Sequence, residues 1–336
     1  MSSRQKLIDA VTLRQILIER YSRGEAKSLS KVLTKMDKAI AKIVGSKFGK
    51  TRSIFLSRQV EKLAQSFLRD YSDDMLKGLE SFTLKEAKYA EDLLAKSTAA
   101  SVIKRAPIPA LKKAVRKRPM ELLIDGNIKK VTIEQAVKQF SKNQSKRIGQ
   151  IIKDGANSGV TTPQMVKEIR EIVKTRTKTQ AAALVRTTTN HMSTVAMEEA
   201  FSGNDELLEG WQWVAVLDSR TSLTCAGLDG KRFELKSDQS KPPIHWGCRS
   251  RWIPRVKPEF DLGSEVGGER AAMNGAQPAN TTYGGWLGRQ DKGVQNEVLG
   301  STRAKLFRSG KLSISKFTDR KGNVLTLDQL AQRNSL

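Results

Sequence analysis

The chain is poor in the features that mark disulfide-rich, secreted or membrane-spanning proteins. It has two cysteines among 336 residues, too few for a disulfide framework. Its first six residues include two cations and no apolar stretch, so we expect no ordinary signal peptide. No uncharged apolar run approaches the roughly 18 residues that a membrane span needs. These absences predict a protein made in a reducing cytoplasm, and they favour a partner other than a membrane.

Acidic residues are also scarce. Asp and Glu number 35 against 60 Lys and Arg, which gives a formal net charge of +25. The excess is local, because residues 1–50 carry 12 basic and 4 acidic residues whereas residues 201–300 carry 12 and 13. A strong positive excess attracts polyanions over long distances. Nucleic acid is therefore the first partner class that the composition suggests.

One basic cluster has no acid within it. Seven cations and no carboxylate lie between positions 104 and 118. We interpret the cluster as a contact for DNA phosphates, without base recognition, rather than as a solvated helix face. The predicted DNA-binding residues are Lys104, Arg105, Lys112, Lys113, Arg116, Lys117 and Arg118.

Tryptophan and proline divide the chain into two kinds of sequence. All five tryptophans lie between positions 211 and 286, and no proline precedes Pro107. The length exceeds what one hydrophobic core usually supports, so we expect more than one folded part. The sequence predicts an α+β protein with a predominantly helical N-terminal half, a small mixed α/β module and a flexible C-terminal tail. The predicted parts are a helical, basic region over 1–120, the module over 121–260, and a Gly-rich linker with a basic tail over 261–336.

Apolar spacing and turn residues predict the secondary structure. Apolar residues at intervals of three and four over the first 100 positions predict a helical hairpin or bundle. Thr132 and Gln135 form a predicted capping box, and Thr162 before Pro163 predicts another helix start. A further helix is expected over about 179–201. After it, the aromatic and β-branched run from Trp211 predicts a small sheet, and the glycines of 261–300 predict a flexible connection.

Three short segments hold most of the residues able to do chemistry. They are Asp218–Cys225, Leu228–Lys231 and Pro242–Ser250. Their pattern, Asp-x-Arg-Thr-x-x-x-Cys, then Leu-Asp-Gly-Lys, then Pro-Pro-x-His-x-x-Cys-Arg, resembles the core of the phage Mu protein F-like family. The upstream Arg186–Asn190 segment and segments downstream near Gln295 are also similar, so the resemblance covers roughly residues 130–320. The residues assigned to the motif and its structural core are Arg186, Asn190, Asp218, Arg220, Thr221, Cys225, Asp229, Gly230, Pro243, His245, Cys248 and Arg249.

The resemblance implies a minor head, or head morphogenesis, protein of a tailed phage. Such a protein is not expected to be an enzyme. It is expected at the portal inside the capsid, next to packaged double-stranded DNA, where it aids assembly, packaging or genome ejection. Its expected partners are the portal protein, DNA without sequence preference, and other head or scaffolding proteins. Its expected location is the virion, after assembly in the host cytoplasm.

Two interpretations of the motif chemistry remain open. Cys225, His245 and Cys248 have the ligand types and spacing of a zinc site, with Asp218 or Asp229 as a fourth ligand. Relatives carry further cysteines at two positions where this chain has serine, and three ligands do not close a structural zinc site. We favour the alternative, a packed polar core without a cofactor, in which the motif arginines pair with acids.

Two other functions also remain open. An enzyme of ADP-ribosyltransferase-like or nuclease-like type, delivered with the phage genome, would use Arg186, His191 and His245. Only two histidines occur in the chain, which gives such an enzyme few groups to work with. A plain, non-specific nucleic-acid-binding protein would explain the charge but leaves the motif unexplained. We favour the head protein.

Overall fold

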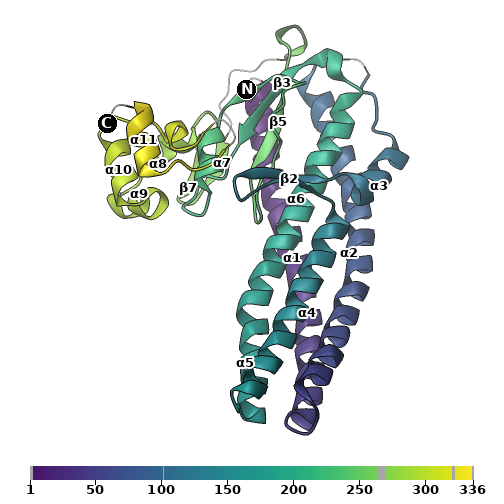
Figure 1. The fold of residues 1–336 in the computed structure, drawn as a ribbon. Coiled ribbons are helices and arrows are strands. Elements are labelled where there is room, and N and C mark those ends of the chain that lie inside the picture. The colour runs from purple at the N-terminus through teal and green to yellow at the C-terminus, as the bar shows by residue number, and fades with distance from the viewer. Residues whose placement is uncertain (1–2, 101, 263–268, 320–321, 335–336) are drawn as a thin grey trace.

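The molecule combines a long helical shaft with a compact sheet region at one end and a small lobe beside it, as Figure 1 shows. This computed structural model describes residues 3–100, 102–262, 269–319 and 322–334. The predicted fold class is confirmed, since long N-terminal helices precede small sheets and short helices. The helices of the shaft are α1 (Ser3–Lys47), α2 (Ser53–Ser97), α4 (Ile133–Asn157), α5 (Thr162–Ile172) and α6 (Lys178–Ser202).

Apolar periodicity holds the shaft together. The buried residues of α1 recur every three or four positions, so they lie along one side of the helix. This side packs against α2 and α6. A single hydrophobic cluster includes Leu33 of α1, Leu68 of α2, Ile148 of α4 and Leu184 of α6. The shaft core therefore draws on residues from both sides of position 120.

Helix starts follow the capping signals closely. Thr132 and Gln135 form the predicted reciprocal capping box at the start of α4. The prediction for α5 was wrong by one residue, because Thr161 rather than Thr162 is the N-cap. With Thr161 as the cap, Gln164 occupies the third helical position, and its side-chain oxygen accepts a hydrogen bond from the Thr161 N–H. A short π-helical segment, η1 (Val173–Thr177), then joins α5 to α6.

A helix and a hairpin connect α2 to α4. Helix α3 (Ile108–Lys117) is followed by the antiparallel strands β1 (Met120–Ile124) and β2 (Asn127–Val131). Asp125 and Gly126 both have positive φ at the hairpin turn, as a two-residue turn of this kind requires. No helix in the described ranges is both long and apolar enough to cross a membrane.

The sheet region is built around a central strand. Strand β3 (Leu208–Val214) pairs antiparallel with β4 (Arg232–Phe233) and β5 (Arg251–Val256). Its aromatic residues are buried, and Trp211 stacks on Phe233 with ring centroids 4.3 Å apart. In sequence, the short helix α7 (Leu223–Leu228) lies between β3 and β4. The 3₁₀ turns η2 (Asp205–Leu207) and η3 (Pro258–Phe260) precede β3 and follow β5.

The C-terminal region differs from the predicted linker and tail. Residues 263–268 of the predicted linker lie outside the described residues. The described residues from Glu269 onward form a small lobe around buried Tyr283, Trp286 and Phe317. Its glycines support turns instead of a flexible connection; for example, Gly275 and Gly300 have φ values of 97° and 73°. The elements are β6 (Glu269–Ala272), β7 (Gly275–Pro278), α8 (Tyr283–Gly288), α9 (Lys292–Leu299), α10 (Ser301–Arg308), η4 (Ile314–Phe317) and α11 (Leu327–Asn334).

Candidate functional site

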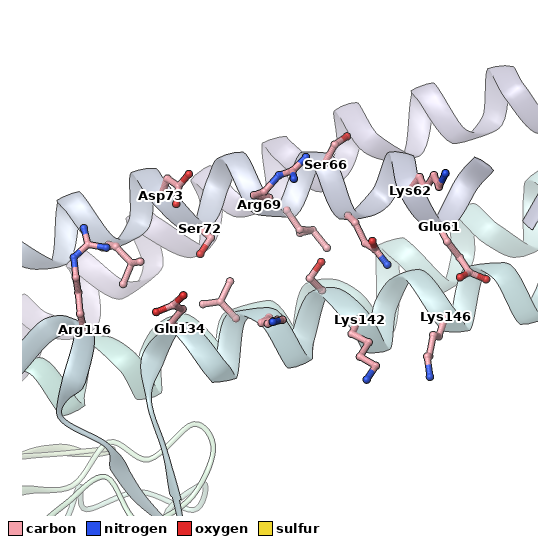
Figure 2. A pocket seen from close by; sticks show the side chains of 16 residues that line it. Glu61, Lys62, Ser66, Arg69, Ser72, Asp73, Arg116, Glu134, Lys142 and Lys146 are labelled. Atoms are coloured by element: carbon pink, nitrogen blue, oxygen red, sulfur yellow. The ribbon is translucent and has the colours of Figure 1, made fainter. Parts of the chain in front are cut away.

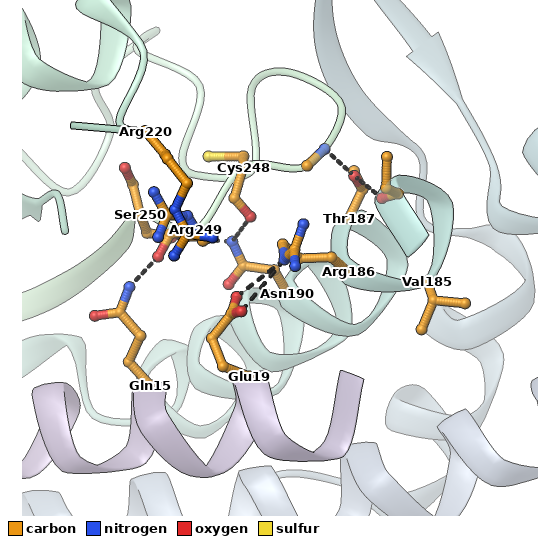
Figure 3. A network of polar contacts seen from close by, with 12 residues as sticks. Gln15, Glu19, Val185, Arg186, Thr187, Asn190, Arg220, Cys248, Arg249 and Ser250 are labelled. Atoms are coloured by element: carbon orange, nitrogen blue, oxygen red, sulfur yellow. Dashed lines mark hydrogen bonds and ion pairs between the residues drawn. The ribbon is translucent and has the colours of Figure 1, made fainter. Parts of the chain in front are cut away.

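The motif residues meet where α6 lies against the loop of residues 242–250. Three polar side chains of α6, from Thr187, Asn190 and Thr194, lie on one face because they are three and four residues apart. The Asn190 amide donates to the carbonyl oxygens of Cys248 and Ser250 at 3.2 and 3.0 Å. Figure 3 shows this network. We call this contact between α6 and the loop the seam.

Two further side chains of α6, on either side of Asn190, also hydrogen-bond backbone groups of the loop. The Thr187 hydroxyl accepts from the Gly247 N–H at 2.7 Å, and the Thr194 hydroxyl donates to the Pro242 carbonyl at 2.5 Å. The three α6 side chains are buried, as is Pro243 beside them. A buried backbone group without a hydrogen-bond partner is costly. These side chains give the backbone groups of the loop the partners that a neighbouring strand would otherwise supply. The seam thereby fixes the loop that carries His245 and Cys248.

Arg186 and Asn190 lie one turn apart on α6 and bind different partners. Asn190 contacts the loop, whereas the Arg186 Nε lies 3.2 Å from the carboxylate of Glu19 on α1. Helix α1 also reaches the loop directly, because the Gln15 amide donates to the Arg249 carbonyl. The seam therefore joins three segments that are far apart in sequence.

Asp218 and Arg249 form an ion pair at the edge of the site. Two guanidinium nitrogens of Arg249 lie 2.5 and 2.6 Å from the Asp218 carboxylate oxygens. The same carboxylate accepts from the Arg220 N–H at 3.2 Å and the Thr221 hydroxyl at 3.1 Å. Burial raises the pKa of Asp218, but the hydrogen bonds and charge of Arg249 outweigh it, so this pKa lies below its usual range.

Asp229, like Asp218, is an acid whose carboxylate binds several groups at once. Its carboxylate accepts the backbone N–H groups of Ala215 and Tyr283, both at 2.7 Å, and pairs with Arg270 at 2.5 Å. The next residue, Gly230, has a φ of 77° in the tight turn predicted for Leu228–Lys231. The carboxylate thus links the sheet region to the C-terminal lobe.

Cys225, His245 and Cys248 converge in the interior. The two sulfurs are 3.7 Å apart, and the His245 Nε2 lies 3.2 Å from the Cys225 sulfur. The His245 Nδ1 donates to the Trp246 carbonyl at 3.0 Å, which leaves Nε2 facing the cysteines and the Ser222 hydroxyl. Cys225 comes from α7 and the other two from the loop, so the cluster also joins these elements.

The pKa values of the two thiols and the imidazole are shifted in different directions. Burial raises the pKa of the Cys248 thiol, but a hydrogen bond from Cys225 and the charge of His245 outweigh it, so the pKa is lowered. The hydrogen bond with Cys248, together with burial, raises the pKa of Cys225. Burial lowers the pKa of His245, but the neighbouring Cys248 charge overcomes this and raises it to about 9. The arrangement favours one thiolate beside an imidazolium.

The geometry suits a metal ion held by three protein ligands. The ligand atoms of Cys225, His245 and Cys248 all lie within 4.8 Å of one another, and they are of the nitrogen and sulfur types that zinc prefers. The predicted fourth ligands are wrong, because Asp218 is bound by Arg249 and Asp229 by Arg270 and backbone N–H groups. A bound zinc would therefore complete its coordination with water or the nearby Ser222 hydroxyl.

The predicted DNA-binding cluster divides into two groups. Lys104 pairs with Glu206 at 3.0 Å, Arg116 with Glu80 at 3.3 Å, and Arg118 with Glu198 at 3.0 Å. The other four cations are exposed, and no ion pair is found for them in the described part of the chain: Arg105, Lys112, Lys113 and Lys117. Acids from other elements thus neutralise part of a cluster that has no acid in its own sequence.

Sequence reasoning missed two arginines of the interior. Arg251 on β5 is fully buried and donates to the Asn190 side-chain oxygen at 3.0 Å and the Ser193 hydroxyl at 2.5 Å. Burial lowers the pKa of this guanidinium to about 10. Arg270 on β6 is the partner of Asp229. Neither arginine is in a recognisable motif, because the groups that they bind come from distant parts of the chain.

The part of the chain that contains the seam also matches a known family. Residues 146–253 match the family model of Phage Mu protein F like protein. The predicted resemblance is confirmed over this stretch, which runs from α4 to β5 and is shorter than the 130–320 expected. The match supports a phage head morphogenesis protein of the virion, from a family of structural head proteins. No curated protein and no solved structure matches the chain.

Proposed function

We propose that this chain is a minor head protein of a tailed bacteriophage, bound at the portal inside the capsid and in contact with packaged DNA. The family match over residues 146–253 carries the proposal. All three motif segments lie in the matched stretch; the first and third meet where Cys225 contacts His245, and Asp229 of the second accepts the Ala215 N–H beside the sheet. The protein would aid assembly, packaging or genome ejection, with the portal and other head proteins as its partners.

The elongated architecture supports a role as a connector between other components of the phage head. The chain has a long shaft with exposed cations, and the seam ties this shaft to the compact sheet region. A rigid body of this kind can hold a protein partner at one place and DNA phosphates at another. Electrostatic contact of this type needs no base recognition.

Quantitative mass spectrometry of purified particles tests the proposal. We expect the chain in intact particles at a low copy number relative to the portal protein, which serves as the counting standard. Loss of the chain after DNA release would assign it a part in ejection. Particles that lack the chain altogether would contradict the minor head function.

The Cys225, His245 and Cys248 cluster has its own test, because a zinc ion there would crosslink α7 to the loop. We expect stoichiometric zinc in the purified chain by elemental analysis, and its loss in Cys248→Ser. Ser222→Ala is the matched control and should keep the metal, since water can take the fourth position. A wild-type chain without zinc, unable to take it up, would establish the cluster as a packed polar core.

A further inference from the structure

One exposed face of α1 carries a row of lysines. Its members are Lys27, Lys31, Lys35, Lys38 and Lys42, and we call them the lysine stripe. They are four, four, three and four residues apart, so at about 100° per residue they fall within an arc of about 80°. All five are exposed. Their alignment is therefore a property of the helix and not only of its composition.

The opposite side of α1 explains why the stripe faces outward. Leu29, Leu33, Met36, Ile40 and Val44 are all completely buried in the shaft core. Their mean direction is about 180° from that of the stripe by helix geometry. The packing of the shaft thus fixes the rotation of α1 and keeps the five ammonium groups in solvent.

The stripe is free of acids and of ion pairs. No Asp or Glu lies within its arc between positions 20 and 42, and no salt bridge to a stripe lysine occurs among the described residues. The two acids of α1 in this interval, Glu25 and Asp37, lie outside the arc by helix geometry, and Asp37 pairs with Arg170. The charge of the stripe is therefore not neutralised by the protein itself.

Helix α2 offers an internal comparison. Its exposed lysines Lys77, Lys85, Lys88 and Lys96 also lie along one face by spacing. Asp74 and Asp92 are on the same face, and Lys88 pairs with Asp92 at 3.4 Å. A row of aligned lysines on this shaft is thus not always free of acidic residues.

The groove between α2 and α4, shown in Figure 2, is likewise mixed. Its volume is about 960 Å³. Lys62, Arg69 and Lys142 line it together with Glu61 and Glu134. In all, six cations and three acids line the groove, so carboxylates offset part of its positive charge. The lysine stripe differs from both surfaces in carrying one sign only.

We propose that the lysine stripe binds the phosphate backbone of double-stranded DNA, a contact that deepens the proposed function by naming the surface that faces the packaged genome. A helix that lies on a membrane presents apolar residues beside its cations. Along the stripe itself, residues 27–42, the apolar residues of α1 lie inside the shaft core, and the exposed Leu13, Ile16 and Leu17 on the same face lie ten or more residues before Lys27. A protein partner would also need apolar anchors. Phosphates need only cations.

The spacing of the stripe fits this ligand. Neighbouring lysines are about 4.5 to 6 Å apart along α1, since the helix rises 1.5 Å per residue. One strand of a duplex carries a charge about every 3.4 Å of its axis. Each lysine can therefore face a separate phosphate over the length of the stripe, about 22 Å. The long, flexible side chains absorb the remaining mismatch.

Fluorescence anisotropy with a random-sequence duplex of about 20 base pairs, two helical turns, tests the proposal on the full chain. The stripe variant changes Lys31, Lys35, Lys38 and Lys42 to Gln. The matched control changes the same number of lysines on α2, Lys77, Lys85, Lys88 and Lys96, to Gln. A third variant neutralises the α3 region at Lys112, Lys113, Arg116, Lys117 and Arg118. Circular dichroism confirms that each variant is folded.

We expect the stripe variant to bind at least tenfold more weakly than wild type and to lower the slope of log affinity against log salt by about 3 to 4. The α2 control should stay within about threefold of wild type. Equal losses in the two variants would overturn the proposal, as would a stripe variant that binds like wild type. Stripe-dependent binding to vesicles of equimolar phosphatidylglycerol and phosphatidylcholine, without DNA binding, would also overturn it.

The outcomes separate this proposal from the proposed function. If wild type binds DNA and only the α3 variant is impaired, the DNA contact stands but the stripe is not its site. If wild type does not bind DNA, both the stripe and the DNA contact of the proposed function fail. The minor head function is decided independently, by the presence of the chain in particles.

Discussion

The shaft and the sheet region use the same charged residue types in opposite ways. The shaft carries one row of cations on its surface without partners among the described residues, the lysine stripe. The sheet region buries cations in pairs, such as Asp229 with Arg270 of the adjoining lobe, whose side chains are 1% and 6% exposed. Exposed charges contribute little to stability but remain available to ligands, whereas buried pairs are costly to break and unavailable. The environment of a charge, and not its presence, indicates what it does.

The largest effect should come from breaking the buried pair. Asp229→Ala leaves the Arg270 guanidinium buried without its partner and removes the acceptor of two backbone N–H groups. We expect the free energy of unfolding to fall by about 3 to 5 kcal/mol, measured by urea denaturation. Asp92→Ala, which breaks the exposed pair with Lys88, is the control and should cost about 0.5 kcal/mol or less. Similar losses in both variants would break the comparison.

A smaller effect should follow from pH. Burial lowers the pKa of His191 to about 4. The unfolded chain takes up this proton near pH 6.5, so the contribution is complete above that value and is lost as pH falls towards 4. We expect the free energy of unfolding to decline by up to about 3 kcal/mol in this window.

Urea titrations at a series of pH values measure this decline, and His191→Gln should flatten it. The groups near the imidazole are Arg118, Glu121, Glu198 and Lys241. Burial raises the pKa of Glu121, but hydrogen bonds with Ser240 and Lys130 outweigh it and lower this pKa, so the upper part of the window reports the histidine. A wild-type profile that matches that of the Gln variant would show that His191 is already accessible to protons in the fold.

The smallest effect should come from the shaft surface. Replacement of Lys31, Lys35, Lys38 and Lys42 by Gln removes no contact found in the described structure. We expect the free energy of unfolding to change by less than about 0.5 kcal/mol, even though DNA binding should fall. Calorimetry and urea denaturation measure this. A large loss of stability would mean that the stripe supports the fold and would remove the contrast between the two regions.

Local features of the molecule could be predicted from the sequence, and pairings across the chain could not. The periodic apolar residues of α1 and the Thr132 capping box indicate helices because they act within a few residues. The pairing of Asp229 with Arg270 joins positions 41 residues apart, and no local pattern shows it. The same limit explains why both acids were considered as metal ligands.

The candidate site shows the same division. The motif identified Cys225, His245 and Cys248 as a group, and the structure brings them together. The lobe around Tyr283 and Trp286 was expected to be a flexible connection, because its glycine content is visible locally while its burial is not. The burial depends on residues such as Phe317 and Leu330, which follow much later in the chain.

The seam has a mechanical consequence. Helix α1 is 45 residues long, so it extends about 68 Å from the sheet region to the far end of the shaft. Within its first half, Gln15 is hydrogen-bonded to the loop and Glu19 is paired with Arg186 of α6, and the helix also contacts β5. A force applied at the far end therefore acts on the sheet region as through a lever arm, with the seam as its fulcrum.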